Sequence, residues 1–189
     1  AATAAGTVPL AATQVLLTLY FTVALALDAF AIAGQALVGH GLGASDVERV
    51  RAVLRRLLLW GLVTSVGLGV VIAATSPVLP RVFTSDAAIA GAVGAGLLVL
   101  AVSMPIGAVV FILDGVLIGA GDGRYLAWTG VLNLAVYLPL LWWVAGLAGD
   151  DVAAVVGIQL AFCVGYLSAR AVTLSVRARG TRWMRVGAG

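Results

Sequence analysis

Five continuous apolar stretches, each long enough to cross a lipid bilayer, constrain this chain more than any other feature. They cover about residues 10–38, 57–78, 87–118, 125–147 and 152–176. A helix crosses the hydrocarbon core in about 20 residues. The stretches lack the alternation of apolar and polar residues that is typical of membrane β-strands. We therefore predict an all-α fold, a polytopic membrane helix bundle with five transmembrane helices.

The composition supports the same class. Hydrophobic residues make up 62% of the chain and charged residues 10%, whereas an ordinary soluble domain has about 25% charged residues. The lipid bilayer is therefore an expected partner. The formal net charge of +3 does not indicate nucleic-acid binding, because the arginines lie at the ends of the apolar stretches, where membrane topology places them.

The arginines also predict the orientation in the membrane. All eleven basic residues are arginines, and only Arg81 follows the second stretch. The other ten are Arg49, Arg51, Arg55, Arg56, Arg124, Arg170, Arg177, Arg179, Arg182 and Arg185. The positive-inside rule places these ten on the cytoplasmic side. We predict a multi-pass inner (plasma) membrane protein with an outside N-terminus, a cytoplasmic C-terminus and a basic cytoplasmic tail over residues 177–189.

The beginning of the chain resembles the end of an earlier apolar helix. Residues 1–6 (AATAAG) contain no basic residue and no initiator methionine, so they do not fit a signal peptide. An odd number of spans with an outside start is also unusual for a complete inner-membrane protein. We therefore expect the sequence to be a fragment of a longer protein.

Two carboxylates, Asp28 and Asp114, lie in the middle of apolar stretches. A charged Asp at the centre of a transmembrane helix costs about 2.5–3.5 kcal/mol on insertion scales, and such residues often mark a proton, ion or substrate pathway. The alternative is a protonated, hydrogen-bonded Asp that holds two helices together. Gln35 follows Asp28 by two helical turns, so both side chains share one helix face and could line a polar cavity.

Other polar residues in the spans carry weaker hypotheses. Asn133 and Tyr137 lie one helical turn apart in the fourth span and could bind a substrate or a neighbouring helix. No cluster of His, Cys and Glu suggests a metal site, and no intramembrane His can serve as a base for a nucleophile. We expect no cofactor, no bound metal and no enzymatic activity.

Glycines and one cap indicate local structure. Gly115 and Gly119 form a bare helix face beside Asp114 that allows close helix contact. Gly39 and Gly43 could form a similar packing face. Asp46, with the preceding serine, is a candidate cap for the helix that begins after it.

Three segments carry a family resemblance: ALDAFAIAGQALVGHGLGASD at 26–46, LPRVFTSDAAI at 79–89 and FILDGVLIGAGDGRYLAW at 111–128. Together and in this order they resemble the multidrug and toxic compound extrusion transporters, in particular their DinF-like branch. That family has twelve helices in two six-helix lobes. The resemblance implies that residues 1–189 are a partial C-terminal lobe with about helices eight to twelve, and that an N-terminal lobe is missing.

The resemblance further implies a secondary active multidrug efflux antiporter that exports small amphipathic or cationic compounds by alternating access. The coupling ion would be H⁺, or alternatively Na⁺. Asp28 and Asp114 then become coupling or cavity-lining residues, and Gln35, Asn133 and Tyr137 weaker candidates for the substrate cavity.

The sequence leaves two alternatives open. One is a lipid-linked saccharide flippase of the same superfamily, although such proteins need a strongly cationic cavity and this chain has no arginine within its spans before Arg170, at the end of the last span. The other is a truncated product or half-size structural subunit with no autonomous transport.

Overall fold

The computed structural model describes residues 2–146 and 150–186. Every regular element within these ranges is helical. The elements are α1 (Ala2–Ala5), α2 (Thr7–Gly43), α3 (Val47–Thr75), α4 (Pro80–Phe83), α5 (Ala87–Gly119), α6 (Gly123–Ala145), α7 (Asp151–Gln159), the π-helical segment η1 (Leu160–Tyr166) and α8 (Leu167–Arg179). The last three form one continuous helix.

Five helices are long and apolar enough to cross a membrane, which confirms the predicted fold class. α2 extends beyond its predicted span at both ends, charged residues extend α3 and the last helix beyond their apolar stretches, and α5 and α6 keep almost the predicted length. α3 begins ten residues before the predicted span, and α8 continues past residue 176 to Arg179. Residue 147, the predicted end of the fourth span, and residues 187–189 of the predicted tail lie outside the described residues.

Aspartates begin three of the long helical segments. Asp46 accepts a hydrogen bond from the Arg49 backbone N–H at 2.9 Å, which confirms its predicted role as a cap. Asp86 and Asp150 cap α5 and α7 in the same way. A side-chain oxygen at this position satisfies one of the backbone N–H groups that have no partner within the helix.

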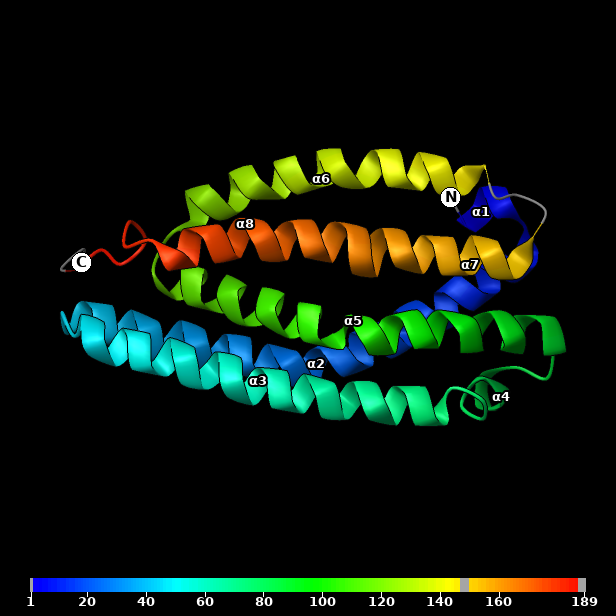
Figure 1. Ribbon diagram of the computed structural model, residues 1–189, viewed down its shortest axis with the longest axis horizontal. Coiled ribbons are helices and arrows are strands. Elements are labelled where there is room, and N and C mark those ends of the chain that lie inside the picture. Colours follow the sequence, from blue (N-terminus) through cyan, green and yellow to red (C-terminus); the bar gives the residue numbers. More distant parts are fainter. Residues whose placement is uncertain (1, 147–149, 187–189) are drawn as a thin grey trace.

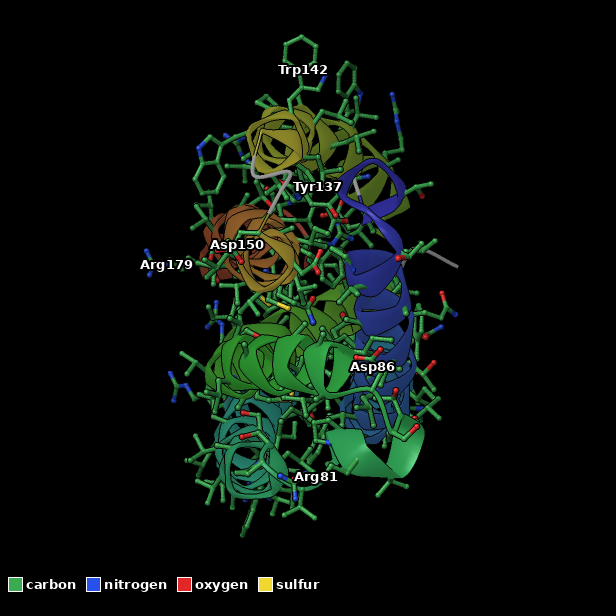
Figure 2. The ribbon with its side chains drawn as sticks, turned by 90° about the vertical axis from the view of Figure 1, so that its right-hand side faces the viewer. Arg81, Asp86, Tyr137, Trp142, Asp150 and Arg179 are labelled. Atoms are coloured by element: carbon green, nitrogen blue, oxygen red, sulfur yellow. The ribbon has the colours of Figure 1, made fainter. Side chains whose placement is uncertain are left out.

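α5 is the central helix of the bundle. In its most apolar 18-residue window 61% of the residues are buried, against 44% or less in the other four membrane-length helices. α2 and α3 pack on one side of α5, and the helix formed by α7, η1 and α8 packs on another (Figure 1). α6 forms the opposite edge from α3, with Trp142 pointing away from the bundle (Figure 2).

The helix directions place the basic segments at one end of the bundle. α2, α5 and α8 run in the same direction, and α3 and α6 return (Figure 1). The turns at 44–46 and 120–122 therefore lie at the same end as the C-terminal segment, whereas α4 and Arg81 lie at the other. α2 contacts α7 near its beginning and packs along α3 near its end.

α2 and α5 approach each other through glycine. A Cβ added at Gly115 would overlap the backbone of Ala31, and a Cβ added at Gly119 would overlap the backbone of Gln35. A Cβ at Gly39 would in turn lie 3.2 Å from the Gly119 carbonyl oxygen. The predicted bare face at positions 115 and 119 is therefore the contact surface between the two helices.

We expect Gly115→Ala to destabilise the bundle by about 1–3 kcal/mol, because the new methyl group forces the α2 and α5 backbones apart. Gly67→Ala is the matched control, since a Cβ there meets nothing within 4 Å. Alanine favours the helix over glycine, so the control should leave stability unchanged or raise it. Thermal unfolding of the purified protein in detergent measures both. Equal melting temperatures for the two variants would contradict the close contact.

Candidate functional site

An ion pair between α5 and α8 contains Asp114, one of the two predicted membrane carboxylates. Arg170 Nε donates to Asp114 Oδ2 at 3.0 Å, and Arg170 Nη2 donates to Asp114 Oδ1 at 2.7 Å. The Arg170 side chain is 15% exposed and the Asp114 side chain 24% exposed. Two parallel hydrogen bonds from one guanidinium to one carboxylate form a strong and directional contact. In this structure Asp114 therefore has an arginine partner.

The position of Arg170 differs from the sequence prediction. It was expected at the end of the last span, but α8 continues for nine further residues, to Arg179. The pairing with Asp114 explains the difference, because an arginine with a carboxylate partner can lie inside a membrane helix at much lower cost than an isolated charge.

A network of polar side chains continues from this ion pair to α6. Thr173 Oγ1 donates to the Arg170 carbonyl oxygen at 2.9 Å, and Asn133 Nδ2 donates to Thr173 Oγ1 at 3.4 Å. Tyr125 Oη donates to the Thr173 carbonyl oxygen at 2.6 Å. Asn133 is 1% exposed, so its amide joins α6 to α8 within the packed bundle.

Tyr137 lies in an aromatic cluster. Its ring centroid is 5.5 Å from that of Tyr166 and 6.2 Å from that of Phe162, and Phe162 also makes an edge contact with Tyr20 of α2. Figure 2 shows Tyr137 on the inner side of α6. The cluster packs α6 and η1 together and reaches the first half of α2.

The second predicted carboxylate, Asp28, lies on a less covered part of α2. Asp28 is half-buried and Gln35 is exposed. Phe21, Leu25 and Ile32, on the same helix face, are between 61% and 72% exposed. No hydrogen bond or ion pair of the Asp28 carboxyl is found within residues 2–146 and 150–186.

α3 covers one side of the α2–α5 pair. A Cβ at Gly34 of α2 would lie against Leu57 of α3, and a Cβ at Gly61 of α3 would overlap Ile112 of α5. Gly34 and Ile112 therefore mark the sides of α2 and α5 that face α3.

Helical geometry places Asp28 and Asp114 on the opposite side of this pair. Each residue turns a helix by about 100°. Ala31 and Gly115 mark the sides of α2 and α5 that face each other. Around the axis of α2, Asp28 and Gly34 lie on opposite sides of Ala31. Around the axis of α5, Asp114 and Ile112 lie on opposite sides of Gly115. The two carboxylates, with Gln35, therefore share the side of the α2–α5 pair that α3 leaves open.

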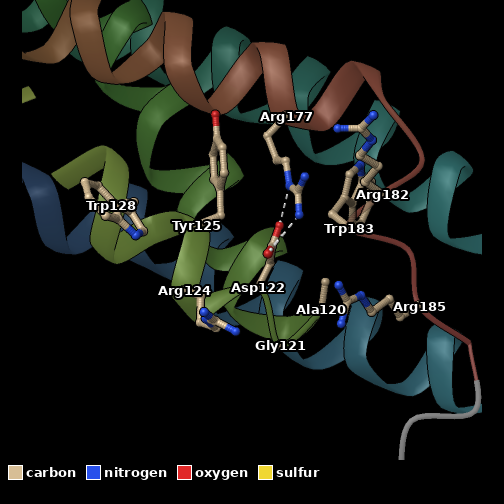
Figure 3. A pocket seen from close by; sticks show the side chains of 10 residues that line it. All are labelled: Ala120, Gly121, Asp122, Arg124, Tyr125, Trp128, Arg177, Arg182, Trp183 and Arg185. Atoms are coloured by element: carbon tan, nitrogen blue, oxygen red, sulfur yellow. Dashed lines mark hydrogen bonds and ion pairs between the residues drawn. The ribbon is translucent and has the colours of Figure 1, made fainter. Parts of the chain in front are cut away.

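A second ion pair lies at the end of the bundle. Arg177 Nε donates to Asp122 Oδ2 at 2.6 Å and Arg177 Nη2 donates to Asp122 Oδ1 at 3.1 Å (Figure 3). Sequence reasoning missed both pairs. The signal present in the sequence is the spacing of Arg170 and Arg177, which lie seven residues apart and therefore on one face of a helix.

The charged groups of the site come from three helices: Asp28 from α2, Asp114 from α5 and Arg170 from α8. The described residues contain no group of three or more His, Cys, Asp or Glu side chains that could hold a metal ion. The site contains a carboxylate–guanidinium pair between α5 and α8 and a second carboxylate, Asp28, on the side of α2 that α3 leaves open.

Comparison with known proteins decides the family. The MatE family profile matches residues 1–143. This chain belongs to the MatE family. The match confirms the family that the three sequence motifs predicted.

Plant relatives agree with the MatE assignment. The chain is 34% identical over 168 residues to Protein DETOXIFICATION 43 of Arabidopsis thaliana. These aligned residues cover 89% of this chain and 31% of the relative. It is 36% identical over 122 residues to Protein DETOXIFICATION 42 of the same plant, covering 65% of this chain and 24% of the relative. The MatE chain thus spans about a third or less of the length of these relatives. No solved structure matches it significantly.

In this MatE chain we expect Arg170→Gln to lower the stability by about 2–4 kcal/mol, because the change leaves the Asp114 carboxylate half-buried without a counter-charge. The double variant Asp114→Asn with Arg170→Gln should recover much of this loss, since it removes both charges. Thermal unfolding of the two single variants and the double variant completes the cycle. Arg179→Gln, an exposed change on the same helix, is the control and should change little. If the stability loss of the double variant equalled the sum of the losses of the two single variants, the pairing would be contradicted.

Proposed function

We propose that this chain forms the C-terminal lobe of a secondary active efflux transporter that exports small amphipathic or cationic compounds in exchange for H⁺, with Na⁺ as the alternative coupling ion. Membership of the MatE family and the names of the DETOXIFICATION relatives support efflux in general. The order of the three sequence motifs supports the DinF-like branch and a position over about helices eight to twelve.

One observation carries the proposal: polar side chains lie on the open side of α2 at membrane depth. Asp28 is half-buried without a partner among the described residues, and Gln35 is exposed. A charge facing hydrocarbon is costly, so intramembrane carboxylates almost always face a bundle interior or a water-filled cavity. This side of α2 therefore suits the wall of a central transport cavity.

The rest of the cavity would come from another lobe. The bulky apolar residues on this side of α2 are well exposed, and the chain covers 31% or less of the relatives' length. A second, N-terminal lobe facing this side would enclose Asp28 and complete a two-lobed transporter. We propose that this missing lobe is the main protein partner of the chain.

The ion pair between Asp114 and Arg170 is the proposed coupling element. Protonation of Asp114, or its coordination of a cation, would weaken its attraction to Arg170 and favour a different packing of α5 and α8. A ligand shifts a conformational equilibrium only by as much as its affinity for the two states differs, and this pair provides such a difference. Asp28, on the same side, is the proposed second coupling or cavity residue.

The weaker candidates differ in support. Gln35 is exposed two helical turns from Asp28 on the same helix face and suits a substrate contact. Asn133 is buried and bonded to Thr173, which favours a structural role in joining α6 and α8. Tyr137 packs in the aromatic cluster and would reach substrate only if α6 moved.

The flippase alternative receives less support. A pyrophosphate site needs uncompensated positive charge, and Arg170, the arginine within the last helix that meets α5, is neutralised by Asp114. The proposed location is the inner (plasma) membrane, with the basic end of the bundle in the cytoplasm, in agreement with the positive-inside rule.

We expect Asp28→Asn and Asp114→Asn, each placed in the intact transporter, to lower H⁺-driven efflux of a fluorescent cation by about tenfold or more, because neither amide can carry the coupling charge. Everted membrane vesicles with an imposed pH gradient provide the measurement. Asp86→Asn is the matched control: it makes the same chemical change at an N-cap where asparagine serves equally well.

An unchanged rate and pH dependence in either variant would remove that aspartate from the mechanism. Because Asp114→Asn also unpairs Arg170, its protein level and melting temperature are compared with those of Asp114→Asn combined with Arg170→Gln. Restored stability without restored efflux would support a transport role beyond folding.

The proposed orientation has its own test. Ala44 lies in the turn after α2 and Ala87 at the start of α5, at opposite ends of the bundle, and both are exposed. In a background without other reactive cysteines, a membrane-impermeant maleimide should label Ala87→Cys in intact cells and Ala44→Cys only after permeabilisation. Native Cys163 is fully buried and should not react. The reverse pattern would invert the orientation.

A further inference from the structure

A cleft with a strongly positive lining lies at the basic end of the bundle. It has a volume of ≈ 420 Å³ and is formed by the turn between α5 and α6, the end of α8 and the C-terminal segment (Figure 3). Its charged residues are Asp122, Arg124, Arg177, Arg182 and Arg185.

Only one of the four arginines is neutralised within the cleft. Both oxygens of Asp122 are occupied by Arg177. Arg124, Arg182 and Arg185 are exposed and form no ion pair with any residue of 2–146 or 150–186. The cleft therefore presents three positive charges in excess, and these come from two different segments of the chain.

The walls of the cleft are held in place by aromatic side chains. Trp183 is 1% exposed, and its indole N–H donates to the Ala178 carbonyl oxygen at 3.2 Å. This anchor fixes the segment that carries Arg182 and Arg185 on either side of it. The Arg177 guanidinium lies 4.8 Å from the ring centroid of Tyr125, a cation–π contact that holds the opposite wall. The predicted basic tail is thus folded against the bundle as far as it is described.

The start of α6 adds hydrogen-bond donors to the cleft. The aspartates that precede α3, α5 and α7 each accept backbone N–H bonds from their helix, whereas Asp122, before α6, makes no such bond. Its carboxylate is engaged by Arg177 instead. The turn itself is tight, with Gly121 at φ 72°, a conformation that favours glycine. The Tyr125 N–H donates to the Asp122 carbonyl oxygen at 3.1 Å. The backbone N–H groups of Gly123 and Arg124 therefore remain available to an anion.

The surroundings of the cleft suit a lipid. Trp128 lines it and is 76% exposed, as is typical of a tryptophan at the headgroup level. Beyond Trp128 the outer face of α6 is apolar and exposed at Val131, Leu132 and Leu138. An acyl chain could follow this face while its headgroup occupies the cleft.

We propose that this cleft binds the phosphate headgroup of an anionic phospholipid from the adjacent leaflet. Arg124, Arg182 and Arg185 bind the headgroup, and the acyl chains lie along α6 from Trp128 onward. The bound lipid bridges the α5–α6 turn and the C-terminal segment. The inference does not depend on the transported substrate or on the coupling ion.

The test is a lipid titration of the delipidated full-length protein that contains this chain, followed by native mass spectrometry. Phosphatidylglycerol should bind about tenfold more tightly than phosphatidylcholine, because each basic side chain near an anionic headgroup contributes to binding. The triple variant R124Q/R182Q/R185Q should lose this preference. The matched control R51Q/R55Q/R56Q removes the same charge from exposed positions on α3 at the same end of the bundle and should retain it.

Two outcomes would overturn the proposal. If R51Q/R55Q/R56Q lost the preference for phosphatidylglycerol to the same extent, the preference would reflect the overall charge of this end of the protein. Inorganic phosphate that binds as tightly as phosphatidylglycerol, with the same dependence on the three arginines, would make the ligand a soluble phosphate compound and not a lipid.

A second variant separates binding from folding. R124K/R182K/R185K retains the charge and should retain most of the preference for phosphatidylglycerol over phosphatidylcholine. Melting temperatures of all three triple variants should agree closely, since these side chains are exposed and Trp183 is unchanged. A lysine variant that folds normally but shows no preference for phosphatidylglycerol would also contradict the proposal.

Discussion

The contact between α2 and α5 organises the bundle, because the two backbones meet without side chains between them. Within a bilayer the lipid is as apolar as the helices, so close packing and not burial from water drives helix association. Gly115 and Gly119 allow that packing on one side of α5. α3 and α8 then cover other sides of α5, and one side of α2, with Asp28 and Gln35, is left open. The same contact that builds the core therefore determines which polar groups remain accessible.

The charges follow a consistent pattern along α8. Its two inner arginines each meet a carboxylate from α5 or from the turn after it, and the arginines of the C-terminal segment have no such partner in the described chain. The paired charges belong to helix packing and to the proposed coupling. The excess charge collects where the bundle meets the membrane surface. The C-terminal part of the chain thus contributes paired charges to the helix bundle and unpaired charges to the membrane surface.

Local sequence patterns predicted most of the fold. Apolar stretches predicted the five membrane-length helices, glycine spacing predicted a close helix contact at Gly115 and Gly119 without naming the partner helix, and a single aspartate predicted the start of α3. The ion pairs were missed because their partners are 55 and 56 residues apart and meet only through the packing of α8 on α5. Arg170 was expected at a span end because hydropathy treats any charge as a boundary. The transport roles of Asp28 and Asp114 stay predictions.

The π-helical segment Leu160–Tyr166 lies between α7 and α8. Its wider turns contain more residues than α-helical turns and so set the angle at which every later side chain leaves the helix. Tightening it by one residue to α-helical geometry would rotate α8 by about 100°. Arg170 and Arg177 would then turn away from Asp114 and Asp122 at the same time. A change from π-helical to α-helical winding in this segment would therefore break both ion pairs at the same time.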